Sequence, residues 1–179
     1  RMEISGVERP NVLEALIDEH NKRGVPIHRL ISTVMGATLL DKRELKDFAQ
    51  MAAEADMEVI LTPRPRPGWD TGAQWRNPEG GLSGIRSRGT DQLRAIIADN
   101  MRGIEVGFRG FLVTDEGLLR ILTKMQKEGD IPEDVVFKVS IYAGHGSSAG
   151  GTMLEDLVAD TFNPLGDLTL PQFSSIRKE

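Results

Sequence analysis

The segment Val135–His145, VVFKVSIYAGH, decides the fold class. Its run of β-branched and aromatic residues predicts a strand over residues 135–141. Successive side chains of a strand point to opposite faces of a sheet. Lys138 and Ser140 therefore share one face, and hydrophobic side chains such as Phe137 share the other. This strand is polar on one side and apolar on the other.

Strands of this kind recur along the chain, and each is followed by a pattern of helical spacing. The predicted strands cover residues 2–6, 28–34, 58–62, 110–114, 135–141 and 160–163. The predicted helices cover residues 10–23, 41–55, 90–106, 116–128, 149–158 and 169–177. Strict alternation of strand and helix predicts parallel strands joined by right-handed crossovers.

Two α/β architectures fit these six units: a TIM-type (β/α) barrel and an open, doubly wound parallel sheet. A sheet covered by helices on both sides is expected to be apolar on both faces, whereas the interior of a barrel carries polar groups near its working end. The one-sided polarity of the fifth strand, and of the first, where Glu3 opposes Ile4, favours the barrel. We therefore predict a single (β/α) barrel domain over residues 1–179, incomplete because such barrels typically have about 250 residues.

Composition limits the classes of function. The net charge of −5 argues against a nucleic-acid partner. The chain has no cysteine, which excludes disulfides, thiolate catalysis and zinc–thiolate sites and fits a cytoplasmic protein. No apolar run approaches the roughly 18 residues of a membrane span, so we expect no membrane partner.

A long segment, residues 63–89, follows the third predicted strand. Loops between a strand and a helix usually have about 2–6 residues, and longer ones commonly carry function. The segment begins PRPRPGWDTGAQW, and its prolines favour an extended path that is neither helix nor sheet. It is rich in arginine, whose planar side chain matches carboxylate or phosphate groups.

Two interpretations of this segment remain open. In the first it covers a small anionic substrate, which we expect to contact Arg64, Arg66, Trp69 and Asp70. In the second it is the contact surface of a homo-oligomer, because tryptophan and arginine are enriched at interface hot spots.

Further candidates follow the carboxyl ends of the predicted strands, where parallel α/β folds collect their functional groups. Asp115 and His145 are candidates for acid–base catalysis, and together with Glu116 they are candidate ligands of a divalent metal, although no cofactor is certain. Asp115 and Glu116 equally suit the start of the next helix, where acidic side chains cap it. Ser140 and Asn163 are expected to bind the substrate.

Lys138 offers a different chemistry. A lysine desolvated inside a barrel forms a Schiff base with a carbonyl substrate. The alternative is a structural ion pair between Lys138 and Glu3.

Five stretches together carry a resemblance: GVPIHRLISTVMGATLL, WDTGAQ, FRGFLVTDEGLL, FKVSIYAGH and ADTFNPLGDLTLPQ. They resemble poorly characterised bacterial proteins labelled as relatives of the collagenase-like peptidases of unknown catalytic type. The resemblance implies a barrel-like domain and a hydrolase, but the cysteines of that family's signature are absent here. The stretch FKVS also resembles the Schiff-base strand of deoxyribose-phosphate-type aldolases, which implies that Lys138 is a reactive lysine.

Three functions are therefore carried forward. The first is a hydrolase-like barrel enzyme acting on a small anionic substrate. The second is a carbon–carbon lyase of the aldolase type that uses Lys138. The third is a non-catalytic scaffold in which residues 63–89 are an assembly surface.

Overall fold

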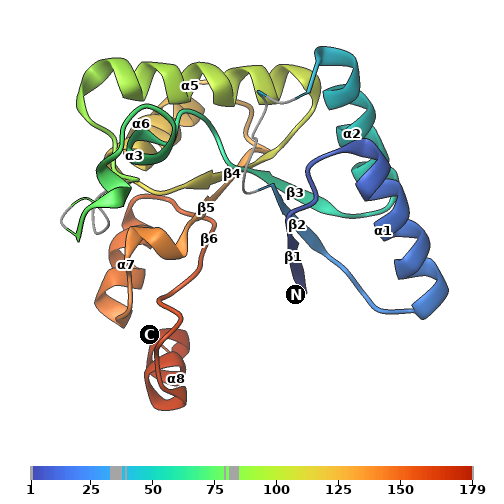
Figure 1. Cartoon of the computed structure of the whole chain (residues 1–179). Helices are drawn as coiled ribbons and strands as arrows, with labels where there is room; N and C mark the ends of the chain where they lie inside the picture. Colours follow the sequence, from blue (N-terminus) through green and yellow to red (C-terminus); the bar gives the residue numbers. More distant parts are fainter. Residues whose placement is uncertain (1, 33–37, 39, 79, 81–84, 179) are drawn as a thin grey trace. The chain divides into compact units, whose positions relative to one another are not determined.

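The computed structural model describes residues 2–32, 38, 40–78, 80 and 85–178. Its strands are β1 (Glu3–Ser5), β2 (Arg29–Ser32), β3 (Glu58–Leu61), β4 (Gly110–Val113), β5 (Val136–Val139) and β6 (Thr161–Phe162). Its helices are α1 (Pro10–Arg23), α2 (Lys42–Glu54), α3 (Pro67–Asp70), η1 (Gln74–Arg76), α5 (Gly89–Val106), α6 (Glu116–Lys127), η2 (Ile141–Ala143), α7 (Ser148–Asp156) and α8 (Leu170–Lys178). All six predicted strands and all six predicted helices are present, with differences at their ends (Figure 1). Residues 33 and 34 of the second predicted strand lie outside the described residues, and residue 141 of the fifth begins η2.

The strands follow one another in the sheet in the order of the chain, β1-β2-β3-β4-β5-β6. The pairs β1–β2, β2–β3, β3–β4 and β5–β6 are parallel. A doubly wound sheet reverses its strand order at a switch point, whereas a (β/α) barrel keeps chain order. The observed order therefore agrees with the barrel and excludes the doubly wound alternative.

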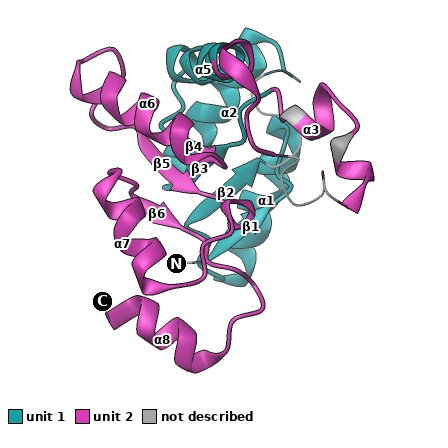
Figure 2. Cartoon of the chain, turned by 90° about the vertical axis from the view of Figure 1, so that its left-hand side faces the viewer, with its two compact units in different colours: residues 1–64, 94–111 teal, residues 65–93, 112–179 magenta. Residues whose placement is uncertain are grey.

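The chain divides into two compact units (Figure 2). Unit 1 contains Arg1–Arg64 and Arg94–Phe111, and unit 2 contains Pro65–Leu93 and Leu112–Glu179. Strand β4 crosses the boundary, since its first half pairs with β3 in unit 1 and its second half belongs to unit 2. The prediction of a single domain stays a prediction.

The core of unit 1 forms between one face of its strands and its helices. Leu61 on β3 packs against α5, where a Cβ placed on Gly103 would lie only 3.2 Å from the Leu61 Cδ1 atom. At Gly110 on β4 a Cβ would lie 2.4 Å from the carbonyl oxygen of Val59, so this close approach of two strands requires glycine. Tight packing of this kind fixes the register of β3 and β4.

The opposite face of unit 1 carries a charge cluster in which a buried arginine lies between two partly exposed glutamates. The register aligns Glu3, Arg29 and Glu58 on three neighbouring strands. Arg29 is almost fully buried, and its guanidinium donates to Glu3 at 2.8 Å and to Glu58. Burial by itself would lower the pKa of Arg29, but the hydrogen bonds to Glu58 and Glu3 outweigh it and raise that pKa. On the polar face expected for β1, Glu3 is partly buried and paired with Arg29, whereas Ser5 is exposed.

Unit 2 is organised around β5 and β6. Phe162 on β6 faces α7, where a Cβ on Gly151 would lie 3.5 Å from its ring. Lys138 pairs in register with Thr161, and Val139 pairs with Phe162, so Lys138 lies on the face turned away from α7. Both faces of β5 are buried, since Phe137 and Lys138 are 0% and 2% exposed. The polar face predicted for this strand is thus internal, as in a barrel.

Candidate active site at the ends of β4 and β5

The carboxyl ends of β4 and β5 lie side by side in unit 2. The backbone N–H of Ser140 donates to the carbonyl oxygen of Val113 at 2.8 Å. The next helix after β4 is α6, and the next after β5 is η2. The residues that begin these helices are therefore brought together, as the sequence predicted for groups at strand ends.

Asp115 caps α6. Its Oδ1 atom accepts from the backbone N–H of Leu118 at 3.0 Å, and its Oδ2 atom accepts from the backbone N–H of Ser87 at 3.2 Å. This confirms the capping interpretation of Asp115. Its carboxylate holds the start of a helix and the end of the long segment 63–89.

Glu116 and His145 are paired, although they are far apart in the sequence. The Nε2 atom of His145 lies 2.7 Å from the Oε1 atom of Glu116. The other side of the imidazole lies against α7, where a Cβ on Gly150 would be 3.1 Å from Nδ1. The backbone at His145 is also fixed, because its carbonyl oxygen accepts from the N–H of Leu165 at 3.0 Å. The imidazole is therefore held between a carboxylate and a helix.

Arg86 completes the cluster. Its guanidinium donates to both carboxylate oxygens of Glu116, with Nη2 at 3.2 Å from Oε1, and also to the carbonyl oxygen of Ala143 at 3.0 Å. A further hydrogen bond holds the residue before Arg86, since Thr114 Oγ1 donates to the carbonyl oxygen of Ile85 at 3.4 Å. We call Arg86, Glu116 and His145 the Arg–Glu–His cluster.

The charges of the cluster stabilise one another. Burial would raise the pKa of Glu116, but the hydrogen bonds from Arg86 and His145 hold it below its ordinary value. The hydrogen bond to Glu116 in turn raises the pKa of Arg86. Glu116 is therefore a carboxylate at neutral pH, and a carboxylate bonded to an imidazole is an arrangement used in acid–base catalysis.

The expected metal site is not assembled in the described part of the chain. No group of three His, Cys, Asp or Glu side chains there is placed to hold a metal ion. The three expected ligands are instead engaged within the protein: Asp115 caps α6, while Glu116 and His145 bond each other. Glu116 and His145 do lie side by side, but they bond each other directly and do not form a metal site with Asp115.

Lys138 and Ser140 lie on the same strand and both are buried. The Ser140 Oγ atom accepts from the backbone N–H of Tyr142 at 3.3 Å and so begins η2. Beside Lys138, the hydroxyl of Thr161 is buried and has no hydrogen-bond partner among the described residues. At the end of β6, the N–H of Asn163 donates to the carbonyl oxygen of Val139 at 2.9 Å. A substrate role for Ser140 and Asn163 stays a prediction.

Residues 63–66 lie in no helix or strand, and Arg66 has the expected extended backbone, but the expectation that the segment forms no helix was wrong. From Pro67 onward the chain forms the short helices α3 and η1, and Pro67 occupies a first helical position, where proline is favourable. Arg66 bonds Asp70 at 3.1 Å and lies over the Trp69 ring at 5.0 Å from its centroid. Arg66 and Asp70 thus bind each other, and their expected contact with a substrate stays a prediction.

Arg64 belongs to unit 1, where its backbone N–H donates to Asp99 at 2.8 Å. Its expected role in anion binding also stays a prediction. Sequence reasoning missed Arg86 as a site residue. It was one of several arginines in the long segment, and no local signal distinguished it.

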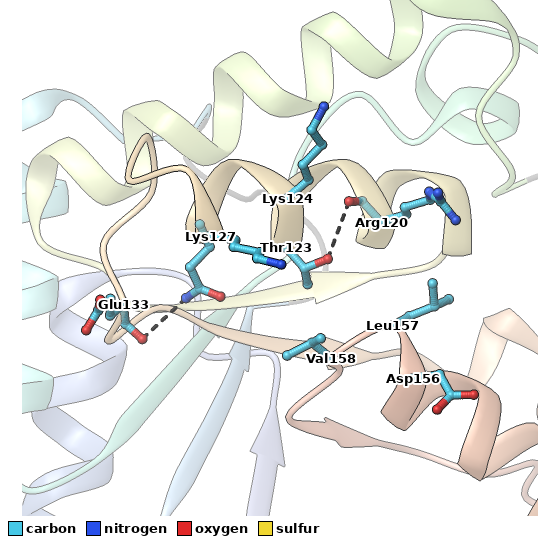
Figure 3. A pocket seen from close by; sticks show the side chains of 9 residues that line it. Arg120, Thr123, Lys124, Lys127, Glu133, Asp156, Leu157 and Val158 are labelled. Carbon is cyan, nitrogen blue, oxygen red and sulfur yellow. Dashed lines mark hydrogen bonds between the residues drawn. The ribbon is translucent and has the colours of Figure 1, made fainter.

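A groove of about 650 Å³ also lies in unit 2 (Figure 3). It runs along α6 and is lined by Thr123, Lys127, Glu133 and Val158, among others, while the Lys124 side chain extends away from Val158. Glu133 and Val158 precede β5 and β6. The groove therefore lies toward the amino ends of these strands, opposite to the end where barrel enzymes carry their active sites.

Comparison with known proteins gives a fold but no family. No protein-family model matches the chain, and no curated protein matches it. Among solved structures, deoxyribose phosphate aldolase from Aeropyrum pernix is similar with a TM-score of 0.50 and 12% identity over 92% of this chain. Dihydrodipicolinate synthase from Rhodopseudomonas palustris is similar with a TM-score of 0.53 and 11% identity over 99% of this chain. For 2,3-dimethylmalate lyase the TM-score is 0.56 and the identity 12%, also over 99% of this chain.

This chain spans 61%, 57% and 62% of the lengths of those three chains. None of the three is described as a peptidase, so the resemblance to peptidase relatives stays a prediction. No helix in the described residues is long and apolar enough to cross a membrane. The chain has the α/β fold of TIM-barrel enzymes, with similarity to an aldolase, a synthase and a lyase, and the predicted fold class is confirmed.

Proposed function

We propose that this chain belongs to a barrel enzyme that makes or breaks a carbon–carbon bond beside a carbonyl group, with Lys138 as the Schiff-base lysine. The observation that carries the proposal is the burial of Lys138, which is 2% exposed on the face of β5 turned away from α7. In a barrel this face is the interior, where a desolvated lysine meets a substrate that enters at the strand ends. The similarity to an aldolase, a synthase and a lyase supports a fold suited to this chemistry.

In the proposed reaction the side-chain amine of Lys138 is the nucleophile. Nζ of Lys138 adds to the carbonyl carbon of the substrate, and loss of water gives an iminium ion. A base removes the proton of the hydroxyl group on the β-carbon, the bond between the α- and β-carbons breaks, and its electron pair moves to the iminium nitrogen. The resulting enamine takes a proton at carbon, and water then hydrolyses the imine and restores the lysine.

The Arg–Glu–His cluster supplies the acid and base in this proposal. Glu116 and His145 follow β4 and β5, and Lys138 lies on β5 two residues before Ser140, which bonds the end of β4. A histidine bonded to a carboxylate is a common acid–base pair in enzymes. Carbon–carbon cleavage needs one such group to take the hydroxyl proton and to give one to the enamine.

Borohydride trapping tests the proposal. The protein is incubated with a panel of aldehydes and 2-keto acids, reduced with sodium borohydride, and digested for mass spectrometry. We expect a substrate-dependent adduct at Lys138 that is lost in Lys138→Met and kept in Lys127→Met, because Lys127 is exposed and lines the groove on α6. Absence of an adduct at Lys138 across the panel, or equal labelling of exposed lysines, contradicts the proposal.

A hydrolase is the second candidate, favoured by the hydrogen bond of 2.7 Å between Glu116 and His145. Such a pair can activate a water molecule as general base. The variant Lys138→Met distinguishes the lyase from the hydrolase. This variant loses lyase activity under the first proposal and keeps hydrolytic activity under the second, provided that its thermal unfolding shows it to be folded.

A further inference from the structure

We propose that Arg86 is the receptor for a carboxylate or phosphate group of the substrate and that Glu116 occupies it until the substrate arrives. The inference deepens the proposed function, because it names the chemical class of the substrate for the same site. The expectation that Arg64 and Arg66 bind the anion is untested, whereas the inference for Arg86 is argued from its contacts.

The first argument is the position of Arg86. Its guanidinium lies where β4 and β5 end, bonded to the first residue of α6 and to the carbonyl oxygen of Ala143 in η2. Its side chain is 37% exposed, so a ligand can reach it. The Arg66 side chain, bound to Asp70 and lying over the Trp69 ring, is only 19% exposed, and the Arg76 guanidinium lies over the Trp75 ring.

The second argument is the chemistry of its partner. Glu116 presents both carboxylate oxygens to the guanidinium, which is the geometry in which arginine binds a carboxylate or phosphate group of a ligand. The Oε1 atom of Glu116 is shared between Arg86 and His145. An anionic substrate that takes over Arg86 leaves Glu116 paired with His145 alone.

The third argument is the effect on catalysis. Glu116 bonded to a cation is a weaker base, because Arg86 contributes to its lowered pKa. Release from Arg86 makes the Glu116–His145 pair a better proton acceptor at the moment the substrate is bound. Binding energy from a part of the substrate that does not react is thereby used to prepare the reacting groups.

The test measures anion binding directly. Uniformly ¹⁵N-labelled protein is titrated with inorganic phosphate or with malonate at an ionic strength held constant with sodium chloride. The arginine Nε–H and backbone signals are followed by NMR. The phosphate and malonate arms distinguish the two sources of the anionic group.

Three variants give opposed expectations. Arg86→Gln should weaken binding at least tenfold, whereas Arg76→Gln should change it less than twofold. Glu116→Gln should tighten binding about fivefold, because it removes a competing, partly exposed carboxylate while keeping a hydrogen-bonding side chain.

Whether Glu116→Gln tightens or weakens anion binding decides whether Arg86 is the anion receptor. If Arg86 and Glu116 only fasten the long segment to the strand ends, Glu116→Gln loosens that segment and weakens binding, which overturns the inference. Absence of binding to wild type and to Glu116→Gln overturns it as well. Wild-type protein separates the two proposals: if it binds the anion as expected but borohydride trapping fails, the lyase proposal alone is rejected.

Discussion

Two neighbouring glycines on α7 offer a matched test of the position of His145. A Cβ on Gly150 would lie 3.1 Å from His145 Nδ1, whereas a Cβ on Gly151 would lie 3.5 Å from the Phe162 ring. Ordinary contact begins at 3.4 Å, so in Gly150→Ala the imidazole must retreat by about 0.3 Å, while Gly151→Ala requires no movement. Both glycines lie in a helix, where alanine is favoured by about 0.5–1 kcal/mol.

The expected effects follow from these distances. A misplacement of 1 Å in an active site can cost about 100-fold in rate, so a shift of 0.3 Å scales to roughly fourfold. We expect Gly150→Ala to lower the rate of any reaction that uses His145 by about this factor, and Gly151→Ala to leave it unchanged. Gly151→Ala should also raise the melting temperature by about 1–4 °C, and Gly150→Ala should raise it less because the strained contact offsets the gain.

The displacement can be measured without a substrate. The chain has three histidines, so imidazole ¹⁵N spectra are simple, and His20→Gln and His28→Gln assign the remaining signals to His145. The His145 signals should move in Gly150→Ala and stay in place in Gly151→Ala. If both variants leave them unchanged, the imidazole does not lie against α7 and the geometry of the cluster is wrong.

Three further outcomes test the ion pairs and the surface. Because the folded-state pKa of Glu116 lies below its ordinary value of 4.5, its pairing with Arg86 stabilises the protein above that pH and is lost as the pH falls through the folded value. Glu116→Gln should therefore cost about 1 kcal/mol at pH 7 and less at pH 3 in urea unfolding, and a cost that grows toward acid would contradict this. Arg29→Met should destabilise unit 1 by about 3–5 kcal/mol, since it leaves two carboxylates without their shared cation, and a loss below 1 kcal/mol would mean that the buried cluster adds nothing. If the exposed Trp69 and Trp75, whose rings lie 5.7 Å apart, form a contact between copies of the chain, changing both to alanine should convert an oligomer to a monomer in sedimentation velocity, whereas an unchanged profile rejects that interface.

Local signals were sufficient for the six strands and the six longer helices. The helix that begins at Pro10 starts and ends at the predicted residues because proline is favourable in the first turn and Gly24 adopts the left-handed conformation that ends a helix. The fifth strand was predicted from β-branched residues, and its alternation correctly separated Lys138 from Phe137. These features depend on neighbours within a few residues, so the sequence carries them directly.

Segment 63–89 shows where local reasoning failed. Its prolines suggested an extended path, but Pro67 begins a helical turn that Asp70 closes by accepting the backbone N–H of Arg66 at 2.7 Å. Proline fixes only its own φ, and both an extended chain and a first helical turn satisfy that value. The helical turn is stabilised by Asp70, which bonds both the backbone N–H and the guanidinium of Arg66.

The sequence by itself determined the alternation of strands and helices and the polar face of β5. Only the tertiary structure decided which groups meet. Arg86 and His145 reach Glu116 from 30 and 29 residues away, respectively. Such partners are selected by the pairing of β4 with β5 and by the return of the long segment to their ends, and no pattern within one helix or strand encodes a contact over that distance.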